Sequence, residues 1–111
     1  MESIAKGKYI RISPMKIRRV VKMLKDKKVN NVLNFLEILP HKGAKILRKI
    51  ILSAVANFKY KNPNEDLNML MIKQILVNQA PVLKRLMPRA RGRADVIRKQ
   101  SSHVIVVLTN E

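Results

Sequence analysis

Two strongly β-like segments near the end of the chain flank about twenty-five residues that have no helical period. The first segment, residues 70–77, is rich in Met, Ile, Leu and Val, and the second, residues 103–109, is the clearest strand in the sequence. A structureless loop of that length is uncommon inside a compact domain unless it is functional. We therefore predict that both strands continue outward as a β-hairpin arm over residues 79–102. At ~3.3 Å per residue, the arm reaches roughly 35 Å from the rest of the chain, which we call the body.

The predicted arm is strongly basic. Residues 80–103 carry seven Lys or Arg side chains against one carboxylate, Asp95. Three of the arginines stand in the run Arg-Ala-Arg-Gly-Arg at residues 89–93, and arginine forms forked hydrogen bonds to phosphate and stacks on bases. An isolated ribbon of this kind gains too little burial to stay ordered in water. We expect it to be ordered by a polyanion.

The body shows a mixed pattern. Residues 6–12 end in an apolar alternation that predicts a short strand, and Ser13-Pro14 predicts the start of a helix. Asn30 is the expected cap of a second helix, which Pro40 ends. A third helix over residues 42–60 has a broad apolar face and is the expected core helix.

The first predicted helix carries cations with no carboxylate on the same face: Lys16, Arg18, Arg19, Lys22 and Lys25. Such a row is usually a solvated face. Here the net charge is +17 over 111 residues, against a magnitude of about 2–8 for a typical small domain. Self-repulsion of this size calls for an anionic partner. Two separate basic surfaces suit a folded RNA, while a DNA-bending protein that uses Met87-Pro88 as a wedge stays an open alternative.

Other function classes find little support. The absence of Cys rules out disulfides, thiolate zinc sites and a catalytic thiol, and two His residues are too few for a metal cluster. Ser102 and His103 are neighbours in a strand and point to opposite faces, so they do not suit a nucleophile and its base. An aromatic share of 4% argues against a protein that binds single strands by stacking. We expect no enzyme, no cofactor and no metal.

A membrane role is not expected either. The longest near-apolar run, residues 50–56, is too short to span a bilayer. The opening residues show no secretory signal. We expect no membrane partner and no homo-oligomer.

The sequence resembles the large-ribosomal-subunit protein twenty-two family over essentially its whole length. The most specific motif is Pro-Arg-Ala-Arg-Gly-Arg-Ala-Asp at residues 88–95, followed by the strand Ser-His-Val-Ile-Val-Val at residues 102–107. Upstream, Ile-Ser-Pro-Met-Lys-Ile-Arg at residues 12–18 resembles the start of the family's first helix. The resemblance implies an α+β fold, in which three helices pack on a three-stranded antiparallel sheet and a long β-hairpin protrudes. It also implies a single domain over residues 1–111.

The resemblance further implies a structural constituent of the large ribosomal subunit. Such a protein binds large-subunit ribosomal RNA across several domains, aids early assembly and lines the nascent-peptide exit tunnel with its hairpin. The implied partners are this RNA, neighbouring proteins including large-subunit protein four near the tunnel constriction, and the nascent polypeptide. The implied location is the ribosome of the bacterial cytoplasm, with the plastid stroma as an alternative.

The residues implied for these contacts fall into two sets. The tunnel-lining tip comprises Arg85, Leu86, Met87, Pro88, Arg89, Ala90, Arg91 and Gly92. The expected RNA-binding side chains are Lys16, Arg18, Arg19, Lys22, Lys84, Arg85, Arg89, Arg91, Arg93, Arg98, Lys99 and His103.

Overall fold

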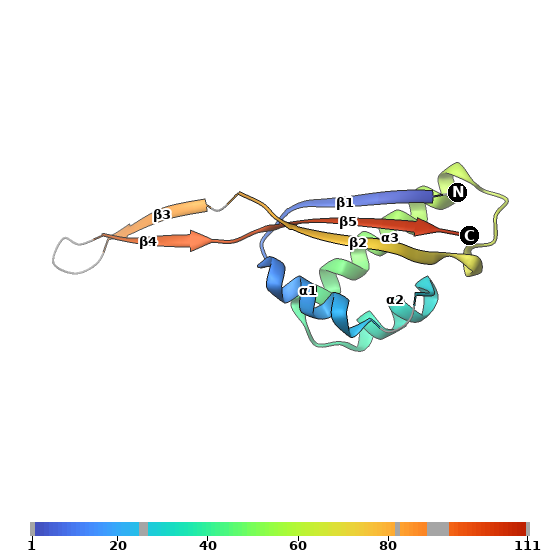
Figure 1. The fold of residues 1–111 in the computed structure, drawn as a ribbon, viewed down its shortest axis with the longest axis horizontal. Coiled ribbons are helices and arrows are strands. Elements are labelled where there is room, and N and C mark those ends of the chain that lie inside the picture. The colour runs from blue at the N-terminus through green and yellow to red at the C-terminus, as the bar shows by residue number, and fades with distance from the viewer. Residues whose placement is uncertain (1, 25–26, 82, 89–93, 111) are drawn as a thin grey trace.

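The computed structural model describes residues 2–24, 27–81, 83–88 and 94–110. The molecule is long and narrow, with extents of 65 × 26 × 16 Å, because a two-stranded arm leaves one end of an α+β body (Figure 1). In the body, three helices pack on a three-stranded antiparallel sheet. This arrangement confirms the predicted fold class, whereas the single domain over residues 1–111 stays a prediction.

The last strand of the chain lies at the centre of the sheet. The strand order is β1-β5-β2, and the three strands are β1 (Glu2–Ile10), β5 (Ser102–Thr109) and β2 (Met71–Gln79). Val104, Val106 and Leu108 of β5 are buried beneath the helices, and the residues between them are only half-buried. Because side chains alternate along a strand, β5 has one face in the core and one face open.

The core lies between this sheet and the helices α1 (Pro14–Met23), α2 (Val29–Ile38) and α3 (Lys42–Lys61). Helix α3 is the core helix, as predicted, and its fully buried stripe is Ala44, Leu47, Ile51, Ala54 and Phe58. The Ser3 hydroxyl donates a hydrogen bond of 2.6 Å to the Ala54 carbonyl, which fastens β1 to α3. A short 3₁₀ turn, η1 (Leu67–Met69), leads from α3 to β2.

Two local predictions were wrong. The first strand was expected at residues 6–12, but β1 begins at Glu2 and ends at Ile10. Pairing with β5 extends its start: Ser3 lies opposite Leu108, although the local sequence there shows little β pattern. Asn30 does not cap the second helix either, because Lys28 is the N-cap and the side-chain amide of Asn30 donates to Asn68. The Val29 N–H bonds to the Leu70 carbonyl, so a tertiary contact fixes where α2 begins.

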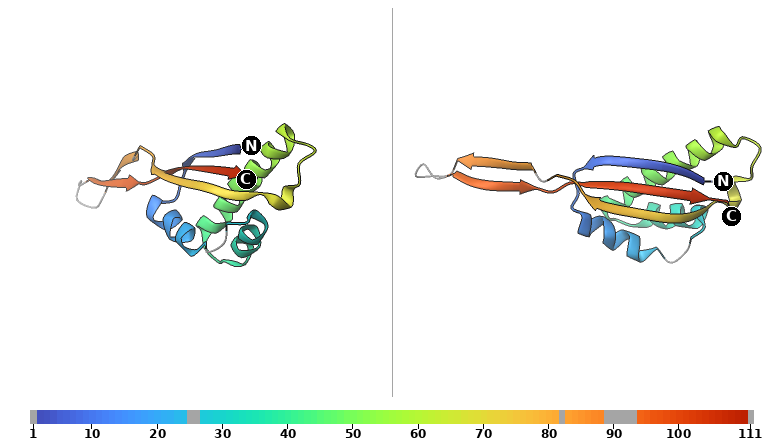
Figure 2. Two further views of the ribbon diagram at one scale, coloured as in Figure 1. Left: turned by 45° about the vertical axis from the view of Figure 1, so that its right-hand side comes forward. Right: turned by 45° about the horizontal axis from the view of Figure 1, so that its top comes forward.

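The arm is a separate antiparallel ladder that continues β2 and β5 outward (Figure 2). It consists of β3 (Leu83–Pro88) and β4 (Ala94–Lys99), with Leu83 opposite Lys99 and Pro88 opposite Ala94. At its root, the Ala80 N–H donates to the Ser101 carbonyl at 2.9 Å. Both strands lie within the hairpin predicted over residues 79–102, and those bounds stay a prediction.

Candidate nucleic-acid interface

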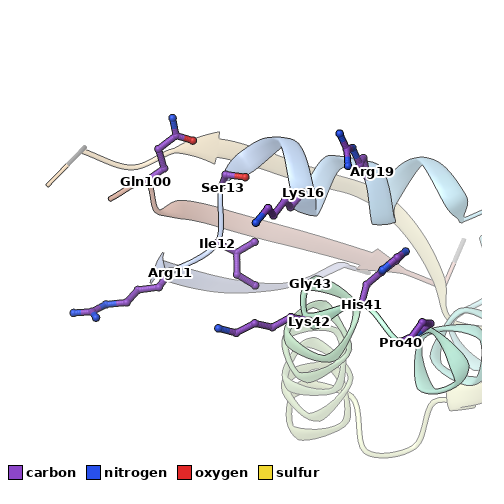
Figure 3. A pocket seen from close by; sticks show the side chains of 10 residues that line it. All are labelled: Arg11, Ile12, Ser13, Lys16, Arg19, Pro40, His41, Lys42, Gly43 and Gln100. Carbon is purple, nitrogen blue, oxygen red and sulfur yellow. The ribbon is translucent and has the colours of Figure 1, made fainter. Parts of the chain in front are cut away.

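A cationic pocket with a volume of about 970 Å³ opens where the arm leaves the body (Figure 3). Its walls come from the β1–α1 link, from α1, from the start of α3 and from the arm root. The lining residues are Arg11, Ile12, Ser13, Lys16, Arg19, Pro40, His41, Lys42, Gly43 and Gln100. Four of these side chains are cations, and none of the lining residues that the structure describes carries a carboxylate. We call this site the cationic pocket.

The burial of α1 directs two of those cations into the pocket. Ile17 and Val20 are almost fully buried against the core. Residues that are not on the buried stripe must lie on the solvent side of the helix, and Lys16 and Arg19 are exposed there. Gly43 of α3 is buried beside α1, and a Cβ atom there would lie 3.5 Å from Val20. This close approach brings the start of α3 to the same pocket.

The start of α3 adds a helix terminus to the cations. His41 is the N-cap residue, its side chain makes no capping hydrogen bond, and the first turn contains no acidic residue. The N-terminus of a helix carries a partial positive charge and backbone N–H groups that suit an anion. Lys42 stands in this first turn, where a cation is unfavourable unless an anion binds nearby. The pocket thus has the electrostatic character of a phosphate site.

Arg18 and Lys22 share another face of α1, because residues four apart lie one above the other. The Arg18 guanidinium donates a hydrogen bond of 2.8 Å from Nη2 to the carbonyl of Val77 in β2. Part of this side chain therefore holds α1 against the sheet. Lys22 is exposed one turn further along.

His103 lies on the open face of the sheet, away from the helices. Its Nδ1 accepts a hydrogen bond of 3.1 Å from the backbone N–H of Tyr9. The two rings meet edge to face, with centroids 4.8 Å apart and planes at 88°. The neighbouring Ser102 is fully buried on the opposite face and donates a hydrogen bond of 2.6 Å to the Ile12 carbonyl. The prediction that Ser102 and His103 point apart is confirmed.

The remaining predicted site residues belong to the arm. Lys84 and Arg85 lie in β3 together with Leu86, Met87 and Pro88 of the expected tip. Arg98 and Lys99 lie in β4, and the register places Lys84 opposite Arg98. The predicted contacts of Arg89, Ala90, Arg91, Gly92 and Arg93 lie outside the described residues.

Comparison with known proteins identifies the family. The family model of ribosomal protein L22p/L17e matches residues 5–109. The chain belongs to this family. Among its relatives, the large ribosomal subunit protein uL22 of Syntrophotalea carbinolica is 50% identical over 111 residues and both chains are covered completely. The uL22 of Geotalea uraniireducens is 47% identical, with 100% of this chain and 99% of the relative covered. That of Desulforamulus reducens is 44% identical, with 100% and 97% covered.

Membership in the L22p/L17e family confirms two predictions. The family resemblance deduced from the arm motif and the strand after it is correct. The relatives are ribosomal proteins and not enzymes, so the expected absence of catalysis is correct as well.

In this member of the L22p/L17e family, three residues of the cationic pocket escaped the sequence analysis: Arg11, His41 and Lys42. A signal for Lys42 was present, because a cation stands at the start of a helix and no Asp or Glu occurs between residues 38 and 64. Arg11 carried no such signal. It reaches the pocket only because the chain turns after β1, where the Ile12 N–H bonds to the Ile10 carbonyl.

Three of the carboxylates that the structure describes lie away from the pocket. Glu2, Glu65 and Asp66 lie near the chain termini and η1, at the end of the body opposite the arm (Figure 1). Glu2 pairs with Lys73, and this hydrogen-bonded ammonium lowers the pKa of the Glu2 carboxyl below its ordinary value. Asp66 caps η1 by accepting from the Asn68 N–H at 2.9 Å. These three carboxylates therefore lie away from the cations that line the pocket.

The described part of the chain contains neither a candidate metal site nor a membrane-spanning helix. No cluster of three or more His, Cys, Asp or Glu side chains there could hold a metal ion. No helix among these residues combines the length and the apolar character needed to cross a membrane.

Proposed function

We propose that this protein is a structural constituent of the large ribosomal subunit and binds large-subunit ribosomal RNA. It belongs to the L22p/L17e family, and relatives with 44–50% identity are named as large ribosomal subunit proteins. The observation that carries the RNA binding is the cationic pocket, where four cations and a helix N-terminus converge without a lining carboxylate. Its place of action is accordingly the ribosome.

The pocket is suited to the sugar–phosphate backbone. Arg11 and Arg19 present planar guanidinium groups that can bind two phosphate oxygens at once, and Lys16 and Lys42 act as point charges. These cations repel one another in the free protein, and a bound phosphate removes that repulsion. The second basic surface, on the arm, lies beyond the pocket and not beside it. RNA that folds around the protein can reach both surfaces.

The arm has a more specific role in this proposal. It lines the nascent-peptide tunnel near large-subunit protein four, with residues 85–92 facing the nascent chain and its basic stem in RNA. The described geometry supports this, because the two-stranded arm projects from one end of the body and the sequence of its strands is basic. The basic surfaces of the body would act early in assembly, since they make contacts that do not need the tip.

A deletion in the arm distinguishes the role of the body in assembly from the role of the arm tip in the tunnel. Removing Leu83, Lys84 and Arg85 shortens β3 by an odd number of residues and reverses the facing of every arm residue beyond them. We expect large subunits still to form in a sucrose gradient, while stalling by tunnel-sensing nascent peptides changes in translation assays. Loss of assembly, or assembly with unaltered stalling, would contradict the tunnel placement.

RNA binding itself is tested by salt dependence. The double variant Arg19→Gln/Lys42→Gln alters the pocket, and Lys59→Gln/Lys61→Gln removes two exposed cations at the other end of α3. For large-subunit ribosomal RNA, the pocket variant should lower the slope of log K against log salt by about 1.5, at roughly 0.7–0.9 per phosphate contact. The control should lower it by much less. Equal losses, or co-sedimentation of the protein with the nucleoid and not with large subunits, would contradict the proposal.

A further inference from the structure

Tyr9 combines a strained backbone with an exposed ring. Its φ angle is +55°, the one positive value of a non-glycine residue in the described part of the chain. It sits where the β1–β5 register shifts between Gly7 and Ile10. In this left-handed conformation the Cβ atom crowds the carbonyl oxygen, and Gly or Asn would fit with less strain. A bulge alone therefore does not explain a tyrosine here.

The Tyr9 ring is held in place although it is 65% exposed. It meets the His103 ring edge to face, and its own backbone N–H donates to His103 Nδ1. Because Nδ1 accepts this bond, the neutral imidazole carries its proton on Nε2, which remains as a donor. The strained turn thus orients two rings together.

Polar side chains surround this pair on the open face of the sheet. The register places Asn78 of β2 directly opposite His103, and Lys6 of β1 opposite Ile105, which makes Lys6 a diagonal neighbour of His103. Asn78 and Lys6 are both exposed. Among the described elements, the helices cover the other face of the sheet (Figures 1 and 2). The open face therefore presents a ring, an imidazole N–H, an amide and an ammonium group together.

We infer that Tyr9, His103 and Asn78 form a binding site for one unpaired nucleobase of RNA. The inference rests on the proposed RNA binding. A base stacks on the exposed part of the Tyr9 ring, as bases stack on aromatic side chains in single-strand sites. His103 Nε2–H and the Asn78 amide supply donors and an acceptor for the edge of the base.

We expect the phosphate group next to the stacked base to lie near Arg11. Arg11 of the cationic pocket stands two residues after Tyr9, so their Cα atoms are at most about 7 Å apart. The backbone of Arg11 therefore lies close to the proposed base site. The low aromatic content still argues against stacking along a whole strand, but it does not exclude a single stacked base.

The test compares two RNA probes of equal charge. One is a ten-nucleotide oligoadenylate, and the other is the same ribose–phosphate chain without bases. Tyr9→Asn removes the ring while it keeps a residue that tolerates the left-handed backbone. Tyr9→Phe keeps the ring. Tyr60→Leu is the matched control, because Tyr60 is 89% exposed at the other end of α3.

We expect Tyr9→Asn to weaken oligoadenylate binding about 5- to 100-fold, to leave abasic binding unchanged and to keep the salt slope. Tyr9→Phe and Tyr60→Leu should bind like the wild-type protein. Wild-type protein that binds both probes equally, with normal salt dependence, would overturn this inference alone. Equal weakening for both probes in Tyr9→Asn would overturn it too. Wild-type protein without salt-dependent binding to either probe would overturn the proposed function together with the inference.

Discussion

The body and the arm both contain antiparallel strands, but the strands of the body are stabilised by a hydrophobic core and those of the arm are not. In the body, β5 pairs on both sides and buries Val104, Val106 and Leu108 under α3. In the arm, β3 and β4 pair only with each other, in a two-stranded sheet. A hairpin without a third strand or a covering helix is marginal in water. The body is thus stabilised by its own core, whereas the arm needs a partner to hold its shape.

Amide hydrogen exchange of the free protein should give the largest contrast. We expect strong protection in α3 and over residues 104–108, because these amides open only with global unfolding of the core. Amides of β3 and β4 should exchange at least about 1000-fold faster, given a global stability of several kcal/mol. Equal protection of β3 and α3 without RNA would show that the arm is stable by itself.

Removing positive charge from the arm should lower RNA affinity and leave the stability of the body unchanged. The variant with Arg89, Arg91, Arg93 and Arg98 replaced by Gln should lower the slope of log K against log salt by about 3. Its thermal unfolding should match that of the wild-type protein, because the core is unchanged. The matched control replaces four exposed lysines of α3 by Gln: Lys45, Lys49, Lys59 and Lys61. If both variants lose the same slope, the arm has no special part in binding.

The difference between the body and the arm also explains which elements could be predicted from the sequence. Helix α3 was predictable because its apolar stripe repeats over twenty residues, and β5 because it alternates beside the core. The arm was predictable for the reverse reason, since a basic stretch without apolar period cannot belong to a core. Local patterns therefore gave the layout of the fold.

Features that depend on contacts distant in sequence were not predictable. The start of α2 is set by the bond from Val29 to Leu70, and the start of β1 by pairing with β5. The cationic pocket joins segments from residues 11–19, 40–43 and 100, so its full lining emerges only in the fold. Tyr9 became a candidate residue only through its backbone angle and its contact with His103.

Arg18 tests whether an arginine on the surface of the body stabilises the fold and does not serve only RNA binding. Arg18→Met keeps the aliphatic part of the side chain but removes the hydrogen bond to the Val77 carbonyl. We expect the free energy of unfolding to fall by about 1–2 kcal/mol, since a hydrogen bond from a charged group contributes roughly 1.5–3 kcal/mol and this one is partly exposed. Lys22→Met on the same helix face should change it by less than about 0.5 kcal/mol. Equal effects in urea unfolding would place Arg18 with the RNA-facing cations.

The smallest expected effect concerns acid and the ion pair between Glu2 and Lys73, which links the two edge strands at the end of the body opposite the arm. The Lys73 ammonium lowers the pKa of the folded Glu2 carboxyl below its ordinary value of 4.5. A carboxyl whose pKa is lowered by folding stabilises the protein above its unfolded pKa, and that contribution disappears as the pH falls through the folded pKa. Wild-type protein should therefore be slightly more stable than Glu2→Gln at pH 6, and this advantage should vanish below the lowered pKa. Because both side chains are exposed, added salt should shrink the difference. Urea unfolding of both proteins from pH 6 to pH 2 measures this, and a difference that is constant over that range would show that the pair adds nothing specific to the body.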